Sequence, residues 1–187
     1  MHDDGLIDKV MFTLCLGRNG GYFQIGGFDG TGFIEAEPTW VTMLSRNSDF
    51  LVTLSGMSMN NHYIVGSNES YRMMIDSGTT FTYFPRPLYN LIESHFKWFC
   101  AMDPKANCKG KMKFDRPGYM CWEVDVSQFK EGVIEFYRSM PILRFHLEAS
   151  PGQKTDTYSY DWYPSEYLYN EQINDYCVAA DIQSNNI

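Results

Sequence analysis

Residues 73–80 have the residue types needed for acid–base chemistry, in an order that a tight loop could use. An apolar run ends on Asp76, and a small hydroxyl residue, a glycine and two threonines follow. A strand would deliver Asp76 to the loop, and Gly78 would let the backbone turn so that its N–H faces the carboxylate. The hydroxyls of Ser77 and Thr79 could reach the same group or a facing loop. A carboxylate held by several donors stays ionised more easily, which suits acid–base catalysis.

The same residues also fit a simpler structure, in which a strand meets a turn. Asp76 and Ser77 would then only satisfy the amides of that turn, as such side chains commonly do. The loop by itself leaves both interpretations open, so the rest of the chain must decide between them.

The composition indicates a folded domain and excludes several classes of function. The 187 residues are 44% hydrophobic and 16% aromatic, enough for one sizeable core. A net charge of −8 argues against nucleic acid or an anionic membrane surface as a partner. No apolar run approaches the roughly 20 residues that span a bilayer. Residues 1–5 lack the basic and apolar parts of a signal peptide.

The segments before the loop predict antiparallel strands. Residues 10–16 and 22–25 would pair across an Asn19-Gly20 turn, after a short helical approach at residues 5–7. The alternating pattern of residues 50–55 predicts a half-buried strand, with a turn or bulge at Gly56.

A second turn is predicted at residues 60–62, with a return strand over residues 63–65. After the loop, Pro87 would lie in the first turn of a helix. Apolar residues recur at helical spacing there: Leu88, Leu91, Ile92, Phe96 and Phe99. Further strands are predicted over residues 121–126, 145–147 and 176–180, and the basic residues 109–113 predict a solvated hairpin.

The loop Asp-Ser-Gly-Thr-Thr, preceded by apolar residues, resembles the second active-site loop of the pepsin-like aspartic proteases. Four other segments look like landmarks of that family in the right order: residues 23–29 (FQIGGFD), 50–59 (FLVTLSGMSM), 141–147 (PILRFHL) and 162–168 (WYPSEYL). Together they cover nearly the whole chain, and all of them resemble the C-terminal lobe of the family.

The resemblance implies a mainly β fold, with a helix after the active-site loop. Residues 1–187 would form one C-terminal lobe of a peptidase domain, truncated at both ends. The family has an apolar-apolar-Gly element after its Tyr-Cys strand, and none occurs downstream of Asp76. Residues 64–66 have suitable letters but lie upstream of the loop. We therefore expect a fragment without the first lobe and the final strands, with Met1 as an internal methionine or a mis-called start.

The resemblance also implies hydrolysis of peptides by two aspartates that share a proton and a water, without a covalent intermediate or a cofactor. Asp76 would be the second aspartate. Gly78 would donate its N–H to the inner carboxylate oxygens and Thr79 its hydroxyl to the outer one. Ser77 would bond across to the facing loop, and Thr80 would contact substrate.

No Asp-Thr-Gly or second Asp-Ser-Gly loop occurs in the 187 residues, so we expect the chain alone to be inactive. Its partners would be a peptide substrate and a missing N-terminal lobe of the same protein. One alternative is a non-catalytic binding or inhibitor-like protein on the same fold. A homodimer that pairs two copies of Asp76 is disfavoured, because the landmarks are those of a cellular C-terminal lobe.

Five cysteines favour an oxidising compartment. The resemblance implies a disulfide between Cys121 and Cys177. Cys100 and Cys108 are close enough in sequence to form a second bridge. Cys15 then remains, either as a buried free thiol or with a partner outside these residues.

A zinc site is the competing use of the cysteines. It would take His95, Cys100, Cys108 and Cys121, but their spacing fits no compact ligand pattern, so we expect no metal. Asn68 begins a glycosylation sequon, which matters only if the chain passes through a secretory lumen. We expect a secretory, lysosome-like, vacuolar or extracellular location.

Overall fold

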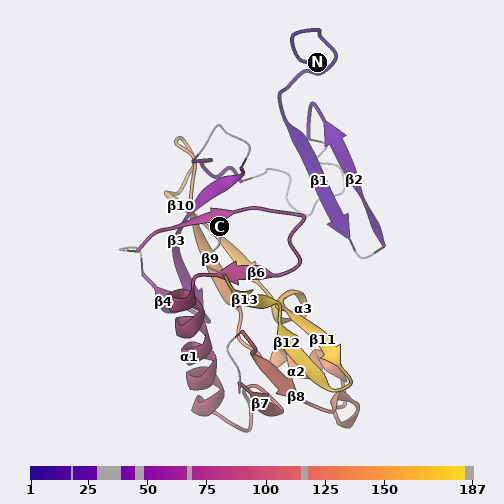
Figure 1. The fold of residues 1–187 in the computed structure, drawn as a ribbon, viewed down its shortest axis with the longest axis vertical. Coiled ribbons are helices and arrows are strands. Elements are labelled where there is room, and N and C mark those ends of the chain that lie inside the picture. Colours follow the sequence, from indigo (N-terminus) through magenta and orange to yellow (C-terminus); the bar gives the residue numbers. More distant parts are fainter. Residues whose placement is uncertain (18, 29–38, 45–48, 67–68, 115–117, 184–187) are drawn as a thin grey trace. The chain divides into compact units, whose positions relative to one another are not determined.

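The computed structural model describes residues 1–17, 19–28, 39–44, 49–66, 69–114 and 118–183. The chain divides into two compact units, Met1–Thr39 and Trp40–Ile187. Figure 1 labels the elements of both units. The sequon at Asn68 lies outside the described residues, so its glycosylation stays a prediction.

The first unit is built on a β-hairpin. Strands β1 (Phe12–Gly17) and β2 (Gly20–Ile25) pair in antiparallel register, with Gly17 opposite Gly20. This confirms the hairpin predicted from Asn19 and Gly20. The helical approach predicted at residues 5–7 is wrong, because Gly5 has a φ of +69° and its N–H closes a turn onto the His2 carbonyl at 3.0 Å.

The second unit contains a five-stranded antiparallel sheet organised around one long strand. Its strand order is β10 (Thr157–Trp162), β9 (Leu143–Glu148), β3 (Leu51–Met59) and β4 (His62–Val65), and β5 (Tyr71–Met74) also pairs with β3. Strand β3 therefore joins β4 at one end and β5 at the other. This pairing holds β5, the strand that leads to Asp76, against the sheet.

Two predicted irregularities of this sheet are confirmed. The register between β3 and β9 shifts between Leu54 and Gly56, which places a bulge at the predicted position. Asn60 and Asn61 have φ values of +43° and +68°, as required for a tight turn between β3 and β4. The Asn60 side chain also accepts the Ile142 N–H at 2.8 Å, so the turn is tied to the segment before β9.

A four-stranded sheet has the order β11 (Leu168–Gln172), β12 (Asp175–Val178), β8 (Cys121–Glu123) and β7 (Lys111–Lys113). The single strand predicted over residues 176–180 is wrong. Ala179 donates its N–H to the Tyr167 carbonyl at 2.7 Å, and the chain then enters β13 (Ala180–Ile182). Strand β13 pairs in parallel with β6 (Thr82–Phe84), so β12 and β13 belong to different sheets.

The strand predicted up to residue 126 ends early. Asp125 accepts the Ser127 N–H at 3.1 Å and caps a 3-10 helix, η1 (Val126–Gln128). Helix α1 (Arg86–Met102) confirms the helix predicted after the loop, with Pro87 in its first turn. Two short helices were not predicted, α2 (Val133–Arg138) and α3 (Pro164–Tyr167). Within the described ranges, no helix combines the length and apolar character needed to cross a bilayer.

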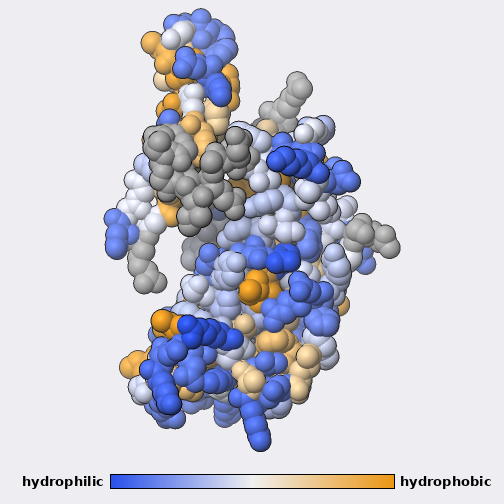
Figure 2. Space-filling model, turned by 180° about the vertical axis from the view of Figure 1, so that it is seen from behind, coloured by the Kyte–Doolittle hydropathy of each residue, from blue (hydrophilic) through white to orange (hydrophobic). Residues whose placement is uncertain are grey.

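The core of the second unit is strongly aromatic. Helix α1 buries one face, which comprises Leu88, Tyr89, Ile92, Phe96 and Cys100. The Phe96 ring lies 5.4 Å from that of Trp122 and 6.0 Å from that of Tyr167, so the helix, β8 and α3 meet at one cluster. On the face of this unit drawn in Figure 2, polar side chains predominate and apolar ones form small separate groups.

The structure contains the two expected disulfides, Cys100–Cys108 and Cys121–Cys177. Cys121 and Cys177 are directly opposite each other on β8 and β12. Three of the four cysteine and histidine ligands of the alternative zinc site are thus in S–S bonds, which excludes that site. Cys15 is a free thiol.

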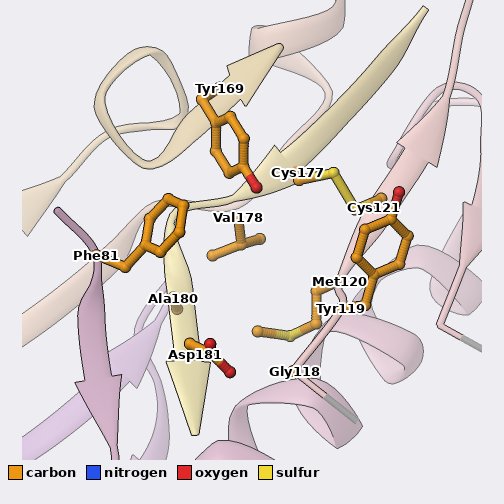
Figure 3. Close-up of a pocket in the computed structure, with 10 residues that line it drawn as sticks. All are labelled: Phe81, Gly118, Tyr119, Met120, Cys121, Tyr169, Cys177, Val178, Ala180 and Asp181. Atoms are coloured by element: carbon orange, nitrogen blue, oxygen red, sulfur yellow. A yellow bond between two sulfur atoms is a disulfide. The ribbon is translucent and has the colours of Figure 1, made fainter. Parts of the chain in front are cut away.

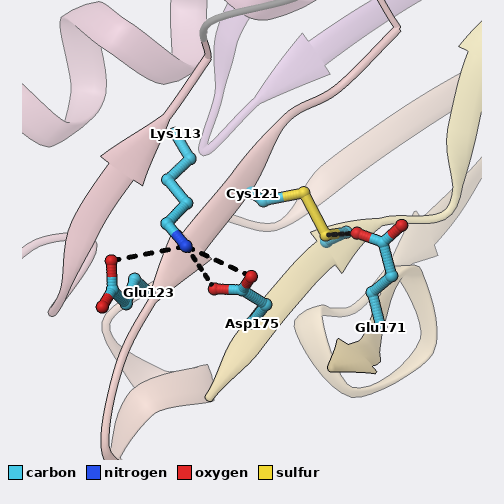
Figure 4. Close-up of a disulfide and its surroundings, with 6 residues drawn as sticks. Lys113, Cys121, Glu123, Glu171 and Asp175 are labelled. Atoms are coloured by element: carbon cyan, nitrogen blue, oxygen red, sulfur yellow. Dashed lines mark hydrogen bonds and ion pairs between the residues drawn. A yellow bond between two sulfur atoms is a disulfide. The ribbon is translucent and has the colours of Figure 1, made fainter. Parts of the chain in front are cut away.

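Ion pairs involve two lysines of the segment that was predicted to be a solvated hairpin. Lys113 Nζ lies 2.9 Å from Asp175 and 3.3 Å from Glu123, as Figure 4 shows beside the Cys121–Cys177 bridge. The hydrogen bond to Asp175 is the main cause that raises the pKa of Lys113. Lys109 pairs with Glu135 at 2.5 Å. Strand β7 pairs antiparallel with β8, and Lys109 and Lys113 stay partly exposed, but their ion pairs with Glu135 and Asp175, far away in sequence, were not predicted.

Candidate active site

Two sheets hold the ends of the loop that contains Asp76. On the incoming side, the Ile75 N–H donates to the Phe50 carbonyl at 2.8 Å, which extends the pairing of β5 with β3 by one residue. On the outgoing side, the Thr82 N–H donates to the Ala179 carbonyl at 2.9 Å, where β6 begins its pairing with β13. Asp76 therefore directly follows the last backbone hydrogen bond of the incoming strand. Its carboxylate is exposed to solvent.

Each oxygen of the Asp76 carboxylate has its own donor. The Gly78 N–H donates to Oδ1 at 2.9 Å, and the Thr79 hydroxyl donates to Oδ2. These hydrogen bonds, that of Thr79 first and that of Gly78 second, lower the pKa of Asp76 below its ordinary value. A side chain at position 78 would crowd the site, because a Cβ there would lie 3.3 Å from Oδ1. The loop thus uses a glycine to bring a backbone donor to the carboxylate.

The other two residues expected to act in the loop have no such role within the described chain. Ser77 and Thr80 are exposed, and neither side chain forms a hydrogen bond with another described residue. The bond of Ser77 to a facing loop and the substrate contact of Thr80 therefore remain predictions.

A lowered pKa does not by itself identify a catalytic carboxylate. Hydrogen bonds from Ser127 and Gln128 also lower the pKa of the half-buried Asp125. Asp125, however, accepts three hydrogen bonds that together cap helix η1, so its donors serve the local fold. Asp76 differs because it lies in a loop between two sheets and caps no helix.

Comparison with known proteins decides the family. The sequence profile of the eukaryotic aspartyl proteases matches residues 1–183. The chain belongs to this family. Over 109 residues it is also 28% identical to a probable aspartic-type endopeptidase of Aspergillus fumigatus. That alignment covers 51% of this chain and 25% of the fungal protein.

Exposed apolar residues also lie beside the loop, where the sequence pattern predicted only strand residues. Ile75 is 51% exposed and Phe50 is 48% exposed, although the backbones of these two residues are hydrogen-bonded. Met74 is exposed as well. The sequence feature that could have indicated this exposure is the apolar run that continues up to Asp76. The last residues of a half-buried strand need not face a core.

The donors of Asp76 make a testable prediction for this protease loop. In a Thr79→Val variant we expect the pKa of Asp76 to rise toward its ordinary value, because the largest cause of its depression is removed. A carboxyl-detected NMR titration measures this directly. The matched control is Ser77→Ala, which removes a neighbouring hydroxyl without a hydrogen bond to Asp76. Equal pKa values in both variants would contradict the assigned donors.

The same shift sets the direction of a stability effect. Because the folded-state pKa of Asp76 lies below the unfolded value, its donors stabilise the fold above the unfolded pKa. That contribution is lost as the pH falls through the folded pKa. The Thr79→Val variant should therefore lose more stability near neutral pH than in strong acid, as urea unfolding at the two pH values would show.

Proposed function

We propose that this chain provides the second aspartate of an aspartic endopeptidase, with Asp76 as a catalytic residue. The proposal rests mainly on one observation: both oxygens of an exposed carboxylate are held by donors from the next three residues. Ser77, Gly78 and Thr79 support the loop, and Thr80 is the proposed substrate contact. Residues 1–187 would act as a C-terminal lobe, and the other aspartate would come from a preceding lobe of the same protein.

The donors favour a particular state of Asp76 in this chemistry. Hydrogen bonds to the charged form of a carboxylate stabilise that form, so Asp76 would enter the cycle ionised. It would accept a proton from the water that attacks the peptide carbonyl, while the other aspartate donates one. Two such carboxylates share one proton and titrate as a pair, so the pH profile of the assembled enzyme would report both groups together.

The substrate and the location follow from the family at a coarse level. Aspartyl proteases act on peptides or proteins, and those of eukaryotes are generally secreted or vacuolar. For this chain we propose passage through the secretory pathway to a lysosome-like, vacuolar or extracellular location. The two disulfides support an oxidising compartment. The net charge of −8 argues against nucleic acid as a partner.

The proposal predicts that the 187 residues alone do not cleave peptides, because the reaction needs two aspartates and the chain has one such loop. The test compares this chain with a longer product expressed from the genomic flanks. Both are assayed on denatured globin at acidic pH, with and without pepstatin. We expect pepstatin-sensitive cleavage by the longer product only.

Two outcomes would overturn the proposal. Pepstatin-sensitive cleavage by the 187-residue monomer would show that one lobe is sufficient. A longer product without a second Asp-Thr/Ser-Gly loop that binds peptides and leaves them intact would instead favour a non-catalytic binding protein on this fold.

A further inference from the structure

A small pocket lies in the second unit, on the side of β13 that faces β8 and β11 (Figure 3). About 250 Å³ of empty space lies between its lining residues, a figure that includes space open to solvent. The residues that define its chemistry are Phe81, Met120, Tyr169, Val178, Ala180 and Asp181. None of the loop residues 76–80 lines it, so the pocket is separate from the candidate active site.

The walls of the pocket are apolar and aromatic. The rings of Phe81 and Tyr169 are tilted by 33°, with centroids 5.3 Å apart, and both face the cavity. Val178, the last residue of β12, and Met120, which directly precedes β8, also line the pocket. Both Cys121 and Cys177 also line the pocket, so a covalent bond holds β8 and β12 together at its wall. The disulfide prevents the two strands from separating at this side of the pocket.

One carboxylate lies at the end of the pocket. Asp181 Oδ1 accepts the Ile182 N–H at 2.6 Å, which leaves Oδ2 available to a ligand. Within the described ranges, no lysine, arginine or histidine forms an ion pair with Asp181. Gly118 approaches this carboxylate so closely that a Cβ there would lie 2.5 Å from Oδ1. The backbone at Gly118 thus makes room for the carboxylate of Asp181.

The negative charge of Asp181 affects the pKa of Tyr89, a buried residue of helix α1. Burial, followed by the charges of Glu93 and Asp181, raises the pKa of Tyr89. The Tyr89 side chain is fully buried, and its hydroxyl has no hydrogen-bond partner among the described residues. A cation bound beside Asp181 would oppose this negative potential.

We propose that the pocket binds a small primary alkylammonium group. The aliphatic part would pack against Val178 and Met120, and the ammonium would donate to Asp181. Aromatic rings attract a nearby cation through their electron-rich faces, which the Phe81–Tyr169 pair would provide. Free alkylamines and the lysine side chain of a peptide share this chemistry. The inference does not depend on the proposed protease function.

Methionine methyl groups report the binding. The protein is labelled with ¹³C at its methionine methyls, and the Met120 signal is assigned with a Met120→Leu variant. Titration with n-butylammonium should shift the Met120 signal, whereas the signal of the exposed Met102 on helix α1 should stay in place. n-Butanol, which has the same chain and no charge, should bind at least about tenfold more weakly, since hydrogen bonds to charged groups are the stronger ones.

Two carboxylate variants test the role of the acid. Asp181→Asn keeps the oxygen that accepts the Ile182 N–H and removes the charge, so affinity for n-butylammonium should fall about tenfold or more. The matched control is Glu148→Gln, which removes an exposed charge from strand β9 outside the pocket and should leave affinity unchanged. Phe81→Leu should weaken binding by about threefold through the lost cation–ring attraction.

The titrations distinguish a lysine side chain from a free amine as the ligand, and they also include results that would contradict the inference. Equal binding of n-butylammonium and Nα-acetyl-lysine N-methylamide supports the pocket as a lysine side-chain site. Binding of n-butylammonium alone supports a site for free amines. Equal affinity of the wild type and Asp181→Asn, or of n-butylammonium and n-butanol, would overturn the inference, as would an unchanged Met120 signal.

Discussion

Replacement of Asp76 by Asn is expected to reduce peptide hydrolysis by the assembled protease by at least about 10²- to 10⁴-fold, the usual contribution of an aligned acid–base group. The amide has nearly the same volume as the carboxylate but cannot share the proton of an aspartate pair. The measurement is kcat on denatured globin at acidic pH, with the longer product that contains both lobes.

The control for this prediction is Asp125→Asn. Asp125 is half-buried and also has a pKa lowered by hydrogen bonds, but those bonds cap helix η1. Its replacement should leave kcat unchanged. Pepstatin-sensitive activity that persists in Asp76→Asn would refute the catalytic assignment, whereas equal losses in both variants would point to a general effect on folding.

Removal of the Cys121–Cys177 bridge is expected to lower the free energy of unfolding by roughly 4 kcal/mol, because the bridge closes a loop with a sequence separation of 56 residues. The Cys100–Cys108 bridge spans only 8 residues, so its removal should cost about 2.5 kcal/mol on the same chain-entropy argument. Paired Cys→Ala variants compared by urea unfolding measure both values. Non-reducing peptide mapping should recover each pair as a linked peptide.

Two results would contradict these expectations for the disulfides. If the short bridge contributes as much as the long one or more, loop length does not control the stabilisation here. If Cys121 and Cys177 are both alkylated as free thiols in secreted material, the bridge is absent and the proposed oxidising compartment loses its support. Since folded domains are stable by only about 5–15 kcal/mol, either loss is large enough to measure.

The sequence by itself determined the features that depend on near neighbours. The donors of Asp76 are two and three residues away, so the order Asp-Ser-Gly-Thr was enough to name them. The turn at Asn60 and Asn61 likewise depends on residues that tolerate positive φ. Helix α1 followed from apolar spacing alone, since one of its faces is buried along most of its length.

The tertiary structure alone decided the features that depend on distant partners. Lys113 pairs with Asp175, 62 residues away, and no local pattern marks either residue as half of a pair. The apolar run at residues 176–180 reads as one strand, but the Tyr167 carbonyl takes the Ala179 N–H and directs the next residues to β6. Strand breaks of this kind depend on which backbone groups are nearby in space.

The pocket at Asp181 also depends on residues that are distant in sequence. Its lining residues come from β6, β8, β11, β12 and β13 or the segments beside them, which span more than half of the chain. Asp181 alone is an ordinary acidic residue in an apolar strand. Only the packing of these strands encloses it with two aromatic rings and leaves it without a cationic partner in the described chain. Burial and the set of neighbouring side chains are properties of the assembled sheets, so no short segment of sequence could encode them.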